Sequence, residues 1–121
     1  ANFFLTEKIS HTGDEFRLQM RNGQQLKVIY DKKNIPNKDH LTIMVRPETV
    51  KLTTDVDSAA VNAIKARVIN VSFTGNLVNY FVCIKGEEAQ FRVQSTPPII
   101  ARQGEEVWLA FSCEDVKILE D

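Results

Sequence analysis

The sequence lacks a large net charge of either sign. Its 121 residues carry 15 Lys and Arg side chains against 16 Asp and Glu side chains, giving a formal charge of −1 and a pI near 6.2. The two signs are mixed along the chain rather than gathered in blocks. A nucleic-acid backbone or an anionic membrane surface is held by a positive field. The composition therefore argues against both and predicts no nucleic-acid partner.

Cysteines and long apolar runs are also scarce. Cys83 and Cys113 are the only two cysteines, and both fall in segments that we expect to be strands. We interpret them as buried thiols of a reducing compartment, while a disulfide between them stays open as the alternative. No apolar run approaches the roughly 20 residues of a membrane span. The sequence starts at Ala1 rather than at a methionine, which we take to indicate a fragment of a longer protein.

Motifs of catalysis are missing as well. The five glycines are isolated turn residues, so the sequence contains no glycine-rich phosphate loop. His11 and His40 have no cysteine or carboxylate at ligand spacing, which favours surface histidines over a metal site. No serine lies in a Gly-x-Ser-x-Gly context. We expect no catalytic, cofactor-binding or metal-binding residue in this chain.

Alternating hydrophobic residues dominate what the sequence does contain. Residues 41–46 alternate aliphatic with other side chains, which predicts a strand with one buried face. Arg46 should be its last residue, because Pro47 cannot donate a hydrogen bond to a sheet. Residues 16–20 and 26–30 alternate in the same way on either side of Asn22-Gly23, the pattern of a β-hairpin.

A second part of the chain repeats the first. Residues 107–118 follow the pattern of residues 41–52, with Glu114-Asp-Val-Lys-Ile118 in the place of Glu48-Thr-Val-Lys-Leu52. Such self-similarity indicates a duplicated structural unit. We predict an all-β fold of two related antiparallel halves, residues 1–52 and 64–121, joined by a connector at 53–63. Each half should hold about five strands curled into a barrel-like unit.

The triplet Arg46-Pro47-Glu48 is the most unusual local motif. In one interpretation, Arg46 and Glu48 end a strand and form an exposed ion pair, which stabilises a protein by at most about 1 kcal/mol. In the other, the rigid proline holds both charges in a fork that contacts another domain or subunit. Trp108 and the Phe3-Phe4 pair could form a stacking surface, although burial of Trp108 in a core or interface is the favoured interpretation.

The chain also resembles a known family along nearly its whole length. The resemblance rests on short segments: Ala1-Asn-Phe-Phe4, Val45-Arg-Pro-Glu48, Ala66-Arg-Val68, Phe73-Thr-Gly75 and Gly104-Glu-Glu-Val-Trp-Leu109. They are similar to the C-terminal TOBE region of ATP-binding subunits of bacterial ABC importers, closest to the polyamine, sugar and iron branch. This resemblance implies an OB-like β-barrel regulatory region on the cytoplasmic face of the membrane. It also implies an upstream nucleotide-binding domain, which would carry ATP and Mg²⁺, and permease subunits as partners.

Two functions follow from these observations. The leading expectation is a non-catalytic regulatory and dimerisation domain, with Arg46, Pro47 and Glu48 as interface or regulatory residues. Residues 77–84 are apolar on both faces of the predicted strand apart from Asn79. Either the other half of the chain covers this strand or it meets a second molecule, and we expect a weak homodimer. The alternative is a small-ligand module that binds an oxyanion, as related barrels of molybdate systems do. Thr74-Gly75-Asn76 and Ser95-Thr96 are its candidate residues, and both are also typical of plain turns.

Overall fold

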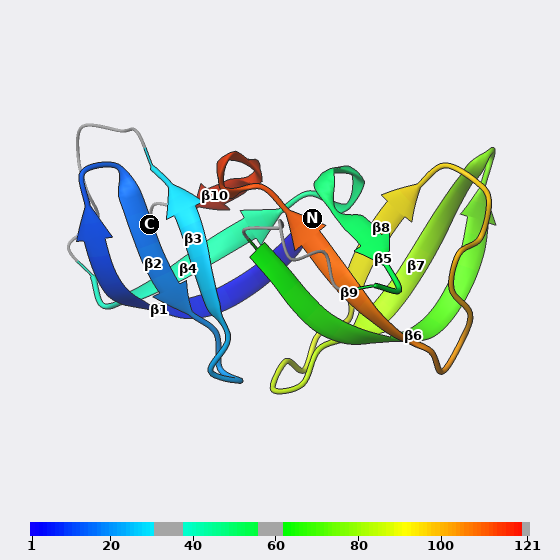
Figure 1. Ribbon diagram of the computed structural model, residues 1–121, viewed down its shortest axis with the longest axis horizontal. Coiled ribbons are helices and arrows are strands. Elements are labelled where there is room, and N and C mark those ends of the chain that lie inside the picture. Colours follow the sequence, from blue (N-terminus) through cyan, green and yellow to red (C-terminus); the bar gives the residue numbers. More distant parts are fainter. Residues whose placement is uncertain (31–37, 56–61, 120–121) are drawn as a thin grey trace.

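Two five-stranded antiparallel sheets, each strongly curled, lie side by side in the protein (Figure 1). The structure is a computed structural model that describes residues 1–30, 38–55 and 62–119. Its strands are β1 (Asn2–Thr12), β2 (Glu15–Gln19), β3 (Gln25–Ile29), β4 (His40–Val45), β5 (Lys51–Thr53), β6 (Asn62–Thr74), β7 (Leu77–Cys83), β8 (Phe91–Ser95), β9 (Glu106–Phe111) and β10 (Val116–Ile118). Two 3₁₀ turns, η1 (Pro47–Thr49) and η2 (Cys113–Asp115), complete the described elements.

The two sheets have equivalent strand orders. The first sheet runs β10-β4-β1-β2-β3 and the second runs β5-β9-β6-β7-β8. The first strand in each half is long and carries an irregularity at the same place, between Lys8 and Ser10 in β1 and between Val68 and Asn70 in β6. The prediction of an all-β, OB-like architecture of two related antiparallel halves is confirmed.

The short strands β5 and β10 are exchanged between the sheets. β5 follows β4 in the chain but pairs with β9 in the second sheet, while β10 follows β9 but pairs with β4 in the first. β3 contacts η2 and β10, and β8 contacts η1 and β5, so each sheet curls back towards its exchanged strand. At these two strands, the predicted halves of the chain therefore differ from the two sheets: β5 begins in the first half but lies in the second sheet, and β10 lies in the second half but in the first sheet. The division into 1–52, 53–63 and 64–121 stays a prediction.

Two asparagines make matching links between the sheets. The side-chain amide of Asn62, in β6, accepts a hydrogen bond from the backbone N–H of Lys27 at 2.8 Å and donates one to its carbonyl oxygen at 2.9 Å. Asn2, in β1, makes the same pair of bonds with the backbone of Arg92 in β8, at 2.7 and 2.8 Å. Both asparagines are buried. Each one therefore satisfies backbone groups of a strand that belongs to the other sheet.

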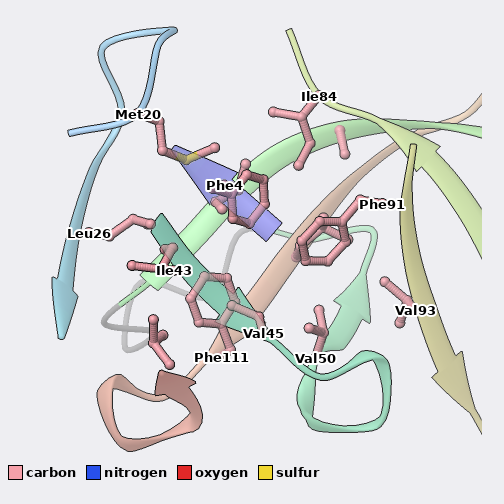
Figure 2. Packing of buried hydrophobic residues seen from close by; sticks show 14 of the residues in the cluster. Phe4, Met20, Leu26, Ile43, Val45, Val50, Ile84, Phe91, Val93 and Phe111 are labelled. Carbon is pink, nitrogen blue, oxygen red and sulfur yellow. The ribbon is translucent and has the colours of Figure 1, made fainter. Parts of the chain in front are cut away.

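One hydrophobic core runs through both sheets (Figure 2). Phe4 of β1 stacks on Phe91 of β8 with ring centroids 5.0 Å apart, so aromatic residues of the two sheets meet directly. Val45 and Phe111, the last residues of β4 and β9, are also buried in this core. Because the core is shared, neither sheet buries its apolar face alone.

Several local expectations need correction. β4 ends at Val45 rather than Arg46, because Arg46 already serves as the N-terminal cap of η1, where Pro47 is the first residue. Both cysteines are free, yet the expectation of buried thiols is wrong: Cys83 is exposed and Cys113 is half-buried in η2 rather than in a strand. Cys83 is exposed because the alternation of β7 turns it away from the core face that holds Val82.

Candidate functional site

The predicted triplet forms the 3₁₀ turn η1 rather than a charged fork. Arg46 and Glu48 are exposed, Pro47 is buried, and no ion pair joins the two charges among the described residues. The carbonyl oxygen of Arg46 accepts hydrogen bonds from the backbone N–H of Thr49 at 3.1 Å and from its hydroxyl at 2.8 Å. The observed role of this segment is to form a turn and to bury Pro47. A role of Arg46, Pro47 and Glu48 in an interface or in regulation stays a prediction.

The equivalent turn in the second half has different chemistry. η2 occupies the place of η1, and Glu114 is its middle residue as Glu48 is in η1. Here the hydroxyl of Ser112 donates to the carboxylate of Asp115 at 2.9 Å, and the backbone N–H of Asp115 donates to the carbonyl of Ser112. The two turns thus have the same backbone hydrogen bond but are stabilised by different side-chain hydrogen bonds.

The predicted oxyanion residues lie at the ends of β6 and β8 and in the segments that follow these strands. Gly75 adopts φ +61° between β6 and β7, in a conformation that favours glycine. The hydroxyl of Thr74 accepts a hydrogen bond from the amide of Asn79 at 2.8 Å. Ser95 ends β8 and pairs with Val78. In these positions the residues serve the chain itself, and none of them lines the cleft described next.

A cleft of about 490 Å³ lies elsewhere, where the two sheets meet. Nine residues line it: Asn22, Gln24, Lys65, Ala66, Arg67, Cys83, Ile84, Lys85 and Glu106. The turn between β2 and β3 supplies the first two, and the second sheet supplies the others. The turns β2–β3 and β7–β8 lie next to each other at the lower centre of Figure 1. At Gly86 an added Cβ atom would lie 3.4 Å from the backbone nitrogen of Asn22, so the two turns are in close contact.

The lining of the cleft is positively charged. Lys65, Arg67 and Lys85 face a single carboxylate, Glu106. Glu106 lies 3.1 Å from the Lys65 ammonium and 3.7 Å from the Arg67 guanidinium. Within the described residues, Lys85 has no ion-pair or hydrogen-bonding partner. Three cations against one anion leave a surplus of positive charge, although the chain as a whole is slightly acidic.

The polar groups of the cleft are held in place by backbone contacts. Arg67 donates to the carbonyl oxygen of Gly104 at 2.7 Å, which fixes its guanidinium beside Glu106. Gln24 donates from its side-chain amide to the carbonyl oxygen of Ala63 at 2.9 Å, and this bond ties the β2–β3 turn to β6. The Asn22 side-chain oxygen accepts from the backbone N–H of Gln24 at 2.8 Å. The site therefore joins groups of both sheets.

Glu87, a half-buried carboxylate that interacts with the charge of Arg21, lies beside the cleft turns. Oxygen Oε2 of Glu87 is buried and has no hydrogen-bond partner among the described residues. Burial raises the pKa of Glu87, and the positive charge of Arg21 lowers it in part. Because the charged form is disfavoured by burial, this carboxyl binds its proton more tightly in the folded chain than in the unfolded chain.

The cleft was not predicted, because Lys85 and Glu106 lie far along the chain from Lys65 and Arg67. A comparison of the two halves would have found part of it. The pair Arg67 and Glu106 stands where the first half has Glu7 and His40, and Lys65 stands where it has Leu5. The predicted even mixing of charges is thus wrong locally, because folding gathers cations that the sequence separates.

Among the described residues, no cluster of His, Cys, Asp and Glu side chains could hold a metal ion. No helix in the described ranges is both long and apolar enough to pass through a membrane. Trp108 lies on the outer face of β9 and is half-buried, so it is not part of the core, and its burial in an interface stays a prediction. Phe3 is 55% exposed, whereas Phe4 belongs to the core.

Comparisons with known proteins give a fold and a family. A solved structure of the cytoplasmic molybdate-binding protein ModG, with molybdate bound, superposes with a TM-score of 0.82 at 13% sequence identity. The match covers 97% of this chain and 94% of that chain, so the two share a fold. No curated protein matches by sequence. The family model described as the TOBE domain matches residues 43–119. The chain therefore belongs to the TOBE domain family.

Proposed function

We propose that this chain is a non-catalytic TOBE module that binds a small oxyanion-bearing ligand in the cleft between its two sheets. The observation that carries the proposal is the surplus of cations, Lys65, Arg67 and Lys85 against Glu106, in a cavity of about 490 Å³. A concave site with a few convergent polar groups is the usual form of a small-molecule site. Arginine and lysine are the side chains that bind oxyanions best, because their donors carry positive charge.

The shared fold supports the same proposal. ModG is described as a cytoplasmic molybdate-binding protein, and its fold covers nearly the whole of this chain. A fold alone does not carry a function from one protein to another. The cationic cleft of this chain is therefore the stronger argument, and the fold adds that such barrels are compatible with an oxyanion ligand.

We also propose a setting for the module. In this proposal it is the regulatory part of an ABC importer ATP-binding subunit in polyamine or sugar import. The resemblance to the C-terminal region of such subunits and membership of the TOBE family support this setting. ATP and Mg²⁺ would then bind to an upstream nucleotide-binding domain, and the permease and a second copy of the subunit would be its partners. This setting is cytoplasmic, at the inner face of the membrane, and it involves no nucleic acid.

Calorimetric titration tests the anion site. Molybdate and inorganic phosphate are titrated into the chain at low salt, and at least one should bind with a single site per chain. The double variant Lys65→Ala/Arg67→Ala should lose at least tenfold in affinity, because two charge-assisted contacts are removed. Lys117→Ala, which removes an exposed cation on β10, is the matched control and should bind as the parent does. Absence of binding, or equal binding by the double variant, would refute the proposal.

A separate experiment tests the setting. The chain is fused to its natural upstream sequence, and ATP hydrolysis is measured with and without the bound anion. A regulatory module should change the hydrolysis rate when the anion binds, and the double variant should abolish that change. If the protein binds the anion but its rate of ATP hydrolysis does not change, the regulatory role is refuted. The anion-binding function then still stands.

A further inference from the structure

The cleft is larger than an inorganic oxyanion requires. Its volume is about 490 Å³. A tetrahedral oxyanion has five heavy atoms and fills only a small part of that space. Sites for organic ligands commonly measure about 300–1,000 Å³. The dimensions therefore suit an oxyanion that is attached to an organic body.

The chemistry of the walls indicates what that body is. One side of the cleft carries the cations Lys65, Arg67 and Lys85, while the β2–β3 turn contributes the side-chain amides of Asn22 and Gln24. Amides both donate and accept hydrogen bonds. The side-chain N–H₂ of Asn22 has no hydrogen-bond partner among the described residues, because only its oxygen is engaged. This wall is suited to hydroxyl groups of a ligand.

No aromatic side chain is among the residues that line the cleft in the described parts of the chain. Proteins that hold nucleobases commonly stack them on aromatic rings. Glu106 adds a carboxylate that is paired with Lys65 and Arg67 and that can also accept hydrogen bonds from hydroxyl groups. A polyhydroxylated body agrees with these groups better than a nucleobase does.

The duplication of the fold provides an internal comparison. At the backbone positions equivalent to Lys65 and Arg67, the first half carries Leu5 and Glu7. Leu5 is 42% exposed there, so the equivalent surface is apolar and acidic rather than cationic. If the lysine and arginine served only to keep a strand face soluble, the first half would have the same need. In the parts of the chain that the structure describes, the cationic pair is therefore present at one of these two equivalent places and not at the other.

We infer that the ligand of the cleft is a sugar phosphate or a similar phosphorylated polyhydroxy compound, bound once per chain. Its phosphate lies against Lys65, Arg67 and Lys85, and its hydroxyl groups reach Asn22, Gln24 and Glu106. This inference rests on the proposed function, which requires only that an oxyanion binds in the cleft. Since the β2–β3 turn belongs to the first sheet and the cations to the second, the bound ligand bridges the two sheets.

Separate titrations of four compounds test the ligand class. Glucose 6-phosphate, glucose, inorganic phosphate and uridine monophosphate are each titrated into the 121-residue chain by calorimetry. Glucose 6-phosphate should bind at least tenfold more tightly than inorganic phosphate, because hydroxyl contacts add to the phosphate contacts. Glucose alone should show no measurable binding. Uridine monophosphate should bind no more tightly than inorganic phosphate.

Variants separate the two parts of the site. Asn22→Ala should reduce the affinity for glucose 6-phosphate about fivefold to tenfold, the effect of losing one hydrogen bond, and leave the affinity for inorganic phosphate unchanged. Lys85→Ala should lower the affinity for both glucose 6-phosphate and inorganic phosphate. Asn70→Ala, an exposed asparagine on β6, is the control for the amide change and should alter neither affinity.

The possible outcomes distinguish this inference from the proposed function. Equal affinities for glucose 6-phosphate and inorganic phosphate would refute the ligand class, while the anion site would stand. Tighter binding of uridine monophosphate would also refute it, in favour of a nucleotide. If none of the anions binds, both the proposed function and this inference fail.

Discussion

The bonds that Asn62 makes to Lys27 allow a sharp test of how the two sheets are held together. Replacement of Asn62 by alanine removes one donor and one acceptor from a fully buried position. The backbone N–H and carbonyl of Lys27 then lose their partners. Replacement by aspartate instead keeps the acceptor for the N–H but sets a carboxylate oxygen against the Lys27 carbonyl.

The magnitude follows from these two bonds. A hydrogen bond contributes about 1 kcal/mol net, and a buried group left without a partner costs about 1–3 kcal/mol. Lys27 is half-buried, so water can satisfy part of what is lost. We expect Asn62→Ala to lower the free energy of unfolding by about 3 kcal/mol. For a chain of this size that corresponds to a drop of roughly 12 °C in melting temperature.

Urea unfolding followed by tryptophan fluorescence and circular dichroism measures the change. Asn70→Ala on the same strand is the control, and its exposed side chain should alter stability by less than about 0.5 kcal/mol. Asn62→Asp should be destabilised at pH 7 and recover as the pH falls, because a protonated carboxyl can donate to the Lys27 carbonyl again. A loss below 1 kcal/mol for Asn62→Ala, or an aspartate variant as stable at pH 7 as the parent, would refute the reasoning.

Three further predictions concern single side chains. Burial raises the pKa of Glu87, so its contribution to stability is present at low pH and is lost as the pH rises from about 4.5 through the raised pKa. Glu87→Gln should therefore flatten the pH dependence of the unfolding free energy and raise that free energy at pH 7 relative to the parent. Arg46→Ala should change the free energy of unfolding by less than about 0.5 kcal/mol, since the residue is exposed and unpaired with Glu48 in the described structure; a cooperative loss of structure on circular dichroism would contradict this. Tyr80→Phe should cost about 1 kcal/mol in urea unfolding, because the buried hydroxyl accepts the backbone N–H of Ile100 at 3.1 Å, and an unchanged midpoint would count against that bond.

Much of the fold could be predicted because local patterns specify it. The alternation in residues 41–45, the Asn22-Gly23 turn and the echo of 41–52 in 107–118 each depend on neighbours in the sequence, and each corresponds to an observed element. The length of β1 was not predictable in this way, because the irregularity near Ile9 interrupts the alternation. The exchange of β5 and β10 also escaped prediction, since it depends on which distant strand each one pairs with.

The candidate site was harder to predict from the sequence than the fold. Lys65 and Arg67 alternate with buried residues, as charged side chains do in any strand that has one solvent-exposed face. Lys85 lies in a turn, where lysine is common. Their convergence depends on the contact between the two turns near Gly86, which no local pattern encodes. The unusual triplet Arg46-Pro47-Glu48 attracted a functional interpretation, which stays a prediction. Backbone geometry accounts for its buried proline.

The exchanged strands have a consequence for how the protein is made. β4 lacks its outer neighbour until residues 116–118 have been synthesised, so the first sheet keeps an open edge while the second half is being translated. Open sheet edges pair readily with other chains. A growing chain of this design is thus most vulnerable to aggregation on the ribosome, and pausing of translation between β5 and β10 should lower the yield of soluble protein. Chaperones that cover strand edges should restore it.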